Sequence, residues 1–101
     1  MAIDLFCYTS HTLADTELTL KAIADQNQGM FLEKFVMSDP RNANAIQKEM
    51  ASEYGINAQS IFLIRLNDKS ATSMVPEVVA ILKDKLGLHD VAVLWENEKL
   101  L

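Results

Sequence analysis

Short apolar segments rich in β-forming residues alternate along this chain with longer segments whose apolar residues recur at helical spacing. The apolar segments are residues 2–9, 30–38, 60–66 and 90–98. The helical segments between them are residues 13–28, 40–54 and 73–86. A helix between two strands carries the chain back to where the first strand began, as in a parallel sheet. The sequence therefore predicts an α/β domain of the form βαβαβαβ, with about four mostly parallel strands and three helices.

Strand 60–66 is the most apolar segment, as expected for a central strand that is covered on both faces. Glu33 and Lys34 interrupt strand 30–38, and such polarity favours the edge of a sheet. With right-handed crossovers, the spatial order 2-1-3-4 would bury the first and third strands. Residues 1–101 are expected to form a single domain, because every connection is short and 50% of the residues are hydrophobic, enough for one core.

Residues typical of helix ends support these boundaries. Thr12, followed three residues later by Asp15, resembles a capping box, and Asp39 before Pro40 reads as an N-cap with proline in the first helical position. The chain has 3 glycines, and each is expected at the end of a helix: Gly29, Gly55 and Gly87. With all three glycines used in this way, neither a dinucleotide fingerprint nor a phosphate loop can be formed.

The charge balance narrows the classes of partner. The chain has 14 acidic and 9 basic residues and a net charge of -5. Binding to nucleic acid needs a basic surface that replaces counterions, so no nucleic-acid partner is expected. An acidic surface suits solubility, and it also suits association with a basic protein.

The apolar runs are far shorter than the roughly 18 residues of a membrane span, so no membrane association is expected. The first residues lack a basic region followed by a long apolar stretch, so we expect no secretory signal and a cytoplasmic location. The single cysteine, Cys7, cannot form an internal disulfide, which agrees with a reducing compartment.

No metal, cofactor or catalytic site is expected. His11 follows a predicted strand while His89 precedes one, so the two histidines would lie at opposite ends of the sheet. With one cysteine as the only thiol, a zinc site cannot be assembled at a recognisable spacing. The sequence therefore predicts a protein that is not an enzyme and carries no cofactor.

One enzymatic alternative is a thioredoxin-like monothiol redox protein that uses Cys7, with Ser10 in the position of a resolving cysteine. A thiol near a helix N-terminus can have a lowered pKa and react as a thiolate. Against this alternative, Cys7 lies within an apolar run, where cysteine is usually buried and inert. The helix is also expected to begin after Thr12, too far along the chain for its dipole to act on Cys7.

In an open parallel sheet, ligands bind beyond the carboxyl ends of the strands. This rule selects acidic residues at or just after the carboxyl ends of the second, third and fourth predicted strands: Asp39, Asp68, Glu96 and Glu98. Trp95 immediately precedes Glu96, and exposed aromatic residues are enriched at the centres of protein interfaces. The sequence therefore predicts an acidic protein-docking edge with Trp95 beside it, although helix capping and turn formation would also explain Asp39 and Asp68.

The opening residues Met1-Ala2-Ile3-Asp4-Leu5-Phe6-Cys7-Tyr8 and the segment from Ile61 to Lys69, together with the size of the chain, resemble small bacterial immunity proteins of contact-dependent growth inhibition systems. The resemblance implies a non-catalytic cytosolic protein. Such a protein binds the C-terminal nuclease domain of a cognate delivered toxin and covers the active site of that domain.

The predicted function is therefore neutralisation of a toxin C-terminal domain, with Asp39, Asp68, Trp95, Glu96 and Glu98 as contact residues. Two further alternatives are a homodimer formed through an exposed edge strand and a structural subunit of a larger complex.

Overall fold

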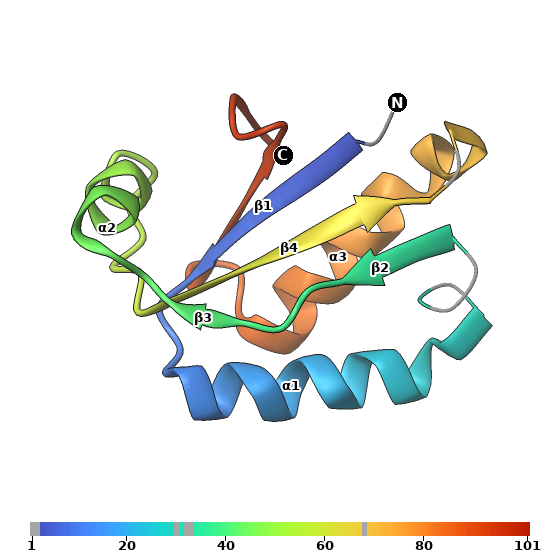
Figure 1. The fold of residues 1–101 in the computed structure, drawn as a ribbon, viewed down its shortest axis with the longest axis horizontal. Coiled ribbons are helices and arrows are strands. Elements are labelled where there is room, and N and C mark those ends of the chain that lie inside the picture. Colours follow the sequence, from blue (N-terminus) through green and yellow to red (C-terminus); the bar gives the residue numbers. More distant parts are fainter. Residues whose placement is uncertain (1–2, 30, 32–33, 68) are drawn as a thin grey trace.

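The computed structural model describes residues 3–29, 31, 34–67 and 69–101 (Figure 1). The helices are α1 (Leu13–Gln26), α2 (Ala45–Ser52) and α3 (Val75–Leu86), and a 3-10 turn over Lys69–Met74 leads into α3. The strands are β1 (Ile3–Thr9), β2 (Phe35–Met37), β3 (Arg41–Asn42), β4 (Ser60–Leu66), β5 (Val91–Trp95) and β6 (Lys99–Leu100).

The six strands form one sheet, and every pair in it is antiparallel. The strand order is β2-β4-β1-β5-β6, and β3 also pairs with β4. The predicted mostly parallel sheet with order 2-1-3-4 is therefore wrong. The predicted number of about four strands is also too low, because β3 directly follows β2 and β6 directly follows β5 without a helix between them. The three helices and the interior positions of β1 and β4 agree with the structure.

The physical reason for the error is that α1 and α3 each connect two strands that are not adjacent in the sheet. Helix α1 does return the chain, so that β1 and β2 run in the same direction, and α3 does the same for β4 and β5. Each crossover passes over one strand, however: β4 lies between β1 and β2, and β1 lies between β4 and β5. The strand in the gap runs the opposite way, which gives the split βαβ arrangement in place of a parallel ladder.

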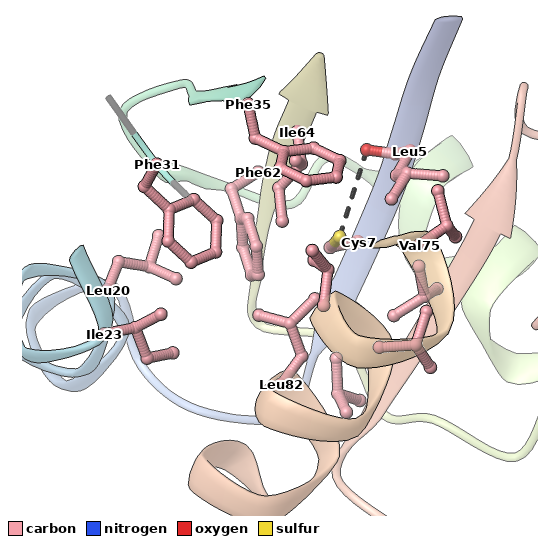
Figure 2. Close-up of a cluster of buried hydrophobic side chains, with 14 of the residues drawn as sticks. Leu5, Cys7, Leu20, Ile23, Phe31, Phe35, Phe62, Ile64, Val75 and Leu82 are labelled. Carbon is pink, nitrogen blue, oxygen red and sulfur yellow. Dashed lines mark hydrogen bonds between the residues drawn. The ribbon is translucent and has the colours of Figure 1, made fainter. Parts of the chain in front are cut away.

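The main core fills the space between one face of the sheet and the helices α1 and α3. Side chains alternate along a strand, so Leu5 and Cys7 of β1 point to this face together with Phe62 and Ile64 of β4. Figure 2 shows these residues gathered with Leu20 and Ile23 of α1, Phe31, Phe35, and Val75 and Leu82 of α3. This face of the sheet is covered along its length.

The opposite face is covered only in part. Figure 1 shows α2 standing apart from α1 and α3, near the end of β1 and the start of β4. There a smaller cluster forms around Tyr8, Ala51 and Leu94, with Phe6 and Ile61 half-buried against it. The short helix leaves the rest of this face uncovered by any helix of the described structure.

The helix ends were predicted with mixed success. Thr12 caps α1 as predicted, because its side chain accepts a hydrogen bond from the backbone N–H of Asp15. The predicted cap at Asp39 is wrong: residues 41–42 form β3, and Asn44 caps α2 in a capping box with Gln47. Helix α1 ends with Asn27 as its C-cap, earlier than the predicted Gly29.

Gly87 ends α3 as predicted, with a φ of 101°, a value that side chains other than glycine rarely adopt.

The boundaries of the second and fourth predicted strands also differ from those observed. The predicted strand 60–66 is β4 at the same limits, whereas the predicted strand 90–98 ends at Trp95 and turns back into β6. Of the predicted strand 30–38, residues 35–37 form β2, and residues 30, 32 and 33 lie outside the described part of the chain.

Candidate functional site

Three of the predicted contact residues lie together at the turn between β5 and β6. Trp95 is the last residue of β5, and Glu96 and Glu98 follow it with exposed side chains. The Trp95 side chain is half-buried and packs against the main core, on the face of the sheet that carries α3. Trp95 is therefore partly engaged in the fold, whereas Glu96 and Glu98 are exposed.

Asp39 lies elsewhere. In the antiparallel sheet, the C-terminal ends of β4 and β5 lie at the same end of the sheet as the start of β1. Strand β2 also begins at this end, so its own C-terminal end lies away from it. Asp39 consequently follows β2 along the side of β4, near the middle of that strand, and its side chain is exposed. Asp68 lies outside the described residues. The structure thus does not gather Asp39 with Glu96 and Glu98 on one edge.

Glu96 has a neighbour that the sequence did not indicate. Its carboxylate Oε1 accepts a 3.2 Å hydrogen bond from the backbone N–H of Asp4, and the Glu96 N–H donates to the Asp4 carbonyl at 2.9 Å. The Asp4 carboxylate accepts two hydrogen bonds from the Arg65 guanidinium, at 2.8 and 3.2 Å. This ion pair satisfies the Asp4 charge and raises the pKa of Arg65.

The turn itself has an unusual backbone. Glu96 and Asn97 have φ values of 53° and 61°, and the N–H of Glu98 donates to the carbonyl of Trp95 at 3.0 Å. Two successive positive φ values are typical of a tight hairpin turn, in which asparagine is favoured and glutamate is not. The Tyr8 hydroxyl donates a 2.7 Å hydrogen bond to Oδ1 of Asn97, which fixes the turn to β1.

A groove of about 450 Å³ crosses the face of the sheet that α2 covers in part. Phe6 of β1 and Leu63 of β4 are direct cross-strand neighbours and form its floor. Ile46 and Met50 of α2 wall one end, and Asn97 lines the groove on the β5 side. Its lining is mainly apolar, with polar groups at the margins, as is common in binding sites.

Asp39 lies on the bank of this groove opposite Asn97. The bank is held in place by Ser38, whose backbone N–H donates to the Leu63 carbonyl and whose Oγ accepts from the Leu63 N–H, both at 2.9 Å. Arg41 lines the same bank. Sequence reasoning missed the groove because it depends on the pairing of Phe6 with Leu63, which only the strand register reveals.

Cys7 is not placed for redox chemistry. Its side chain is buried in the main core, where Sγ lies 3.9 Å from the Leu5 carbonyl (Figure 2). Burial raises the pKa of the Cys7 thiol, so the reactive thiolate is disfavoured. Ser10 lies beyond the end of β1, and its hydroxyl donates to the Asp90 carboxylate at 2.8 Å.

Within residues 3–29, 31, 34–67 and 69–101, no group of three or more histidine, cysteine, aspartate and glutamate side chains is placed to hold a metal ion. None of the described helices is both long and apolar enough to cross a bilayer.

Comparisons with known proteins identify close relatives. The chain matches the family model for the CDI System Immunity Component over residues 1–99. It is 40% identical over 98 residues to the Immunity protein CdiI-2 of Burkholderia pseudomallei strain 1026b, and the match covers 97% of each chain. Its structure is similar, with a TM-score of 0.93 and 38% identity, to a chain in the CdiA-CT/CdiI toxin and immunity complex from Burkholderia pseudomallei. That match covers 97% of this chain and 95% of the other.

Proposed function

Because this chain belongs to the family of immunity components of contact-dependent growth inhibition systems, we propose that it binds the CdiA-CT toxin domain of its own system and neutralises it. The observation that carries this proposal is the full-length structural match to a chain of a toxin and immunity complex, at a TM-score of 0.93. A chain of this family acts by binding, so no catalytic group is required of it.

We further propose that the toxin domain is a nuclease and that this chain covers the active site of the nuclease. A nuclease must attract phosphates and therefore presents a basic surface near its catalytic centre. A compact chain with a net charge of -5 is suited to meet such a surface, because opposite charges accelerate association and orient the partners.

The exposed carboxylates of Glu96 and Glu98 are the proposed electrostatic contacts, and they project from a turn that hydrogen bonds fix to β1. Because this turn is already ordered, little conformational entropy is lost when a partner binds it. Asp39, Trp95 and Asp68 stay predictions as contact residues.

The test is capture of the CdiA-CT toxin domain of the same system, followed by a nucleic-acid cleavage assay with and without the purified chain. Tight, salt-sensitive binding that stops cleavage is the expected result. Absence of any complex at micromolar concentrations would refute the proposal, whereas binding without cleavage by the free toxin would refute only the nuclease assignment.

The role of the turn is tested with the double variant Glu96→Lys and Glu98→Lys. A control with Glu77→Lys and Asp84→Lys changes two exposed carboxylates of α3 by the same total charge. We expect the turn variant to associate about tenfold more slowly than the control at low salt, and the difference to shrink as salt is added. Equal association rates for the two variants would place the contact elsewhere.

A further inference from the structure

The two faces of the sheet are covered very differently. Helices α1 and α3 and the main core bury one face. On the other face, α2 lies over the end where Tyr8 pairs with Ile61, and the next pair along the strands, Phe6 and Leu63, forms the floor of the groove. The groove is therefore the uncovered continuation of a packed layer, with an apolar floor set between two strands that cannot move apart.

One wall of the groove exposes an apolar side chain. Ile46 of α2 is 70% exposed, whereas Met50 is half-buried and Ala51 is buried. An exposed branched side chain beside an apolar floor gives a partner a surface from which water can be expelled. Leu18 of α1 is equally exposed but does not line this groove.

The side of the groove opposite Asn97 carries two charged side chains, those of Asp39 and Arg41. Asp39 and Arg41 are exposed, and neither side chain has a hydrogen bond or ion pair with another residue in the described part of the chain. Asp39 is nevertheless held at a fixed place, because the adjacent Ser38 makes two hydrogen bonds with the backbone of Leu63. A carboxylate that is positioned but unpaired is available to a cation of a partner.

On the basis of the proposed function, we infer that the toxin domain docks into this groove. An apolar side chain of the toxin lies over Phe6 and Leu63 and against Ile46, and a lysine or arginine next to it pairs with Asp39. The choice of occupant follows from charge: an acidic chain that offers an unpaired carboxylate beside an apolar floor complements the basic surface proposed for the toxin. Arg41 on the same bank pairs with an acidic group of the toxin.

The matched pair Ile46→Glu and Leu18→Glu tests this inference. Both residues are 70% exposed and both lie on helices, so the two substitutions should alter stability to a similar, small extent. With the CdiA-CT toxin domain of the same system as the probe, we expect Ile46→Glu to raise the Kd at least about thirtyfold and Leu18→Glu to change it less than about twofold. Thermal unfolding of both variants verifies that they are folded.

Asp39→Lys provides a second measurement, with Asp25→Lys on α1 as its control. We expect the Asp39 variant to bind at least about tenfold more weakly than the control. If wild-type protein binds the toxin but neither Ile46→Glu nor Asp39→Lys weakens binding, the docking inference is overturned while the proposed function stands. If the wild-type protein does not bind the toxin, both fall.

Measurement of the molecular mass in solution tests whether the groove binds the toxin or a second copy of this chain. A wild-type dimer that Ile46→Glu converts to a monomer would assign the groove to self-association and overturn the inference. A wild-type monomer that still requires Ile46 for binding would support it.

Discussion

The hydroxyl of Tyr8 and the side-chain carbonyl of Asn97 are 89 positions apart in the sequence and 2.7 Å apart in the structure. The bond joins the central strand β1 to the turn after β5, where two successive residues have positive φ. A side chain from the middle of the sheet therefore holds in place the turn that carries Glu96 and Glu98.

Replacement of Tyr8 by phenylalanine should lower the free energy of unfolding by about 1 kcal/mol, because Asn97 loses a partly buried hydrogen-bond partner. Tyr54→Phe is the matched control, since Tyr54 is half-buried and its hydroxyl bonds to no other described residue. Urea unfolding of both variants measures the difference. Equal losses in the two variants would mean that the Tyr8 hydroxyl contributes nothing specific to the turn.

Replacement of Asn44 by alanine should destabilise the protein by about 1 kcal/mol, since it removes the N-cap of α2 and half of its capping box. Asp39→Ala, at the cap predicted from sequence, should change stability by less than about 0.5 kcal/mol because that side chain caps nothing. Chemical denaturation distinguishes the two. A larger effect at Asp39 would contradict the observed start of α2.

Gly87→Ala should cost about 1–3 kcal/mol. At Gly87 the φ is 101°, and an added Cβ would lie 2.7 Å from Oδ2 of Asp90, a carboxylate that also accepts a hydrogen bond from Ser10. Gly29→Ala is the control, because a Cβ there meets no atom within 4 Å and no unfavourable φ opposes it. We expect Gly29→Ala to be neutral or slightly stabilising, and a comparable loss at both sites would argue against strain at Gly87.

Cys7 should react slowly with a thiol reagent in the native protein and rapidly after unfolding, because burial both shields the sulfur and raises its pKa. The raised pKa also predicts a dependence of stability on pH. The protonated Cys7 thiol contributes fully to the free energy of unfolding below the pKa of the unfolded thiol, about 8.5. This contribution is lost as the pH rises above that value, because only the unfolded chain then releases the proton.

Unfolding measured between pH 7.5 and 9.5 should therefore show a steeper loss of stability in the wild-type protein than in Cys7→Ala, by up to about 1.4 kcal/mol per pH unit. Identical pH dependence in the two proteins, or rapid labelling of the folded wild type, would show that the thiol is accessible.

Local signals in the sequence located most of the elements. The limits of β4 and the end of α3 at Gly87 follow from an apolar run and from a residue type suited to positive φ. The capping box of α2 was also present in the sequence as Asn44 and Gln47, but the Asp39-Pro40 pair resembles a helix start just as closely. A local pattern cannot choose between two caps when the tertiary pairing of β3 with β4 decides.

The strand order and the candidate site depend on pairings between distant residues. Asp4 and Arg65 are 61 positions apart, and their ion pair follows from the register of β1 against β4. The groove likewise requires Phe6 to lie opposite Leu63. A helix between two strands fixes their relative direction but leaves open whether another strand lies between them. For this reason the predicted parallel sheet is wrong, although the three predicted helices are present.

The position of β1 between β4 and β5 has a consequence for how the protein is made. Residues 3–9 leave the ribosome well before both of their pairing partners, residues 60–66 and 91–95. Until residues 60–66 have been made, Leu5, Cys7 and both edges of strand β1 are unprotected, and closure of such long loops slows folding. A chain cut short before residue 91 would retain a central strand with one open edge, whose unpaired backbone groups could pair with another chain until β5 is made.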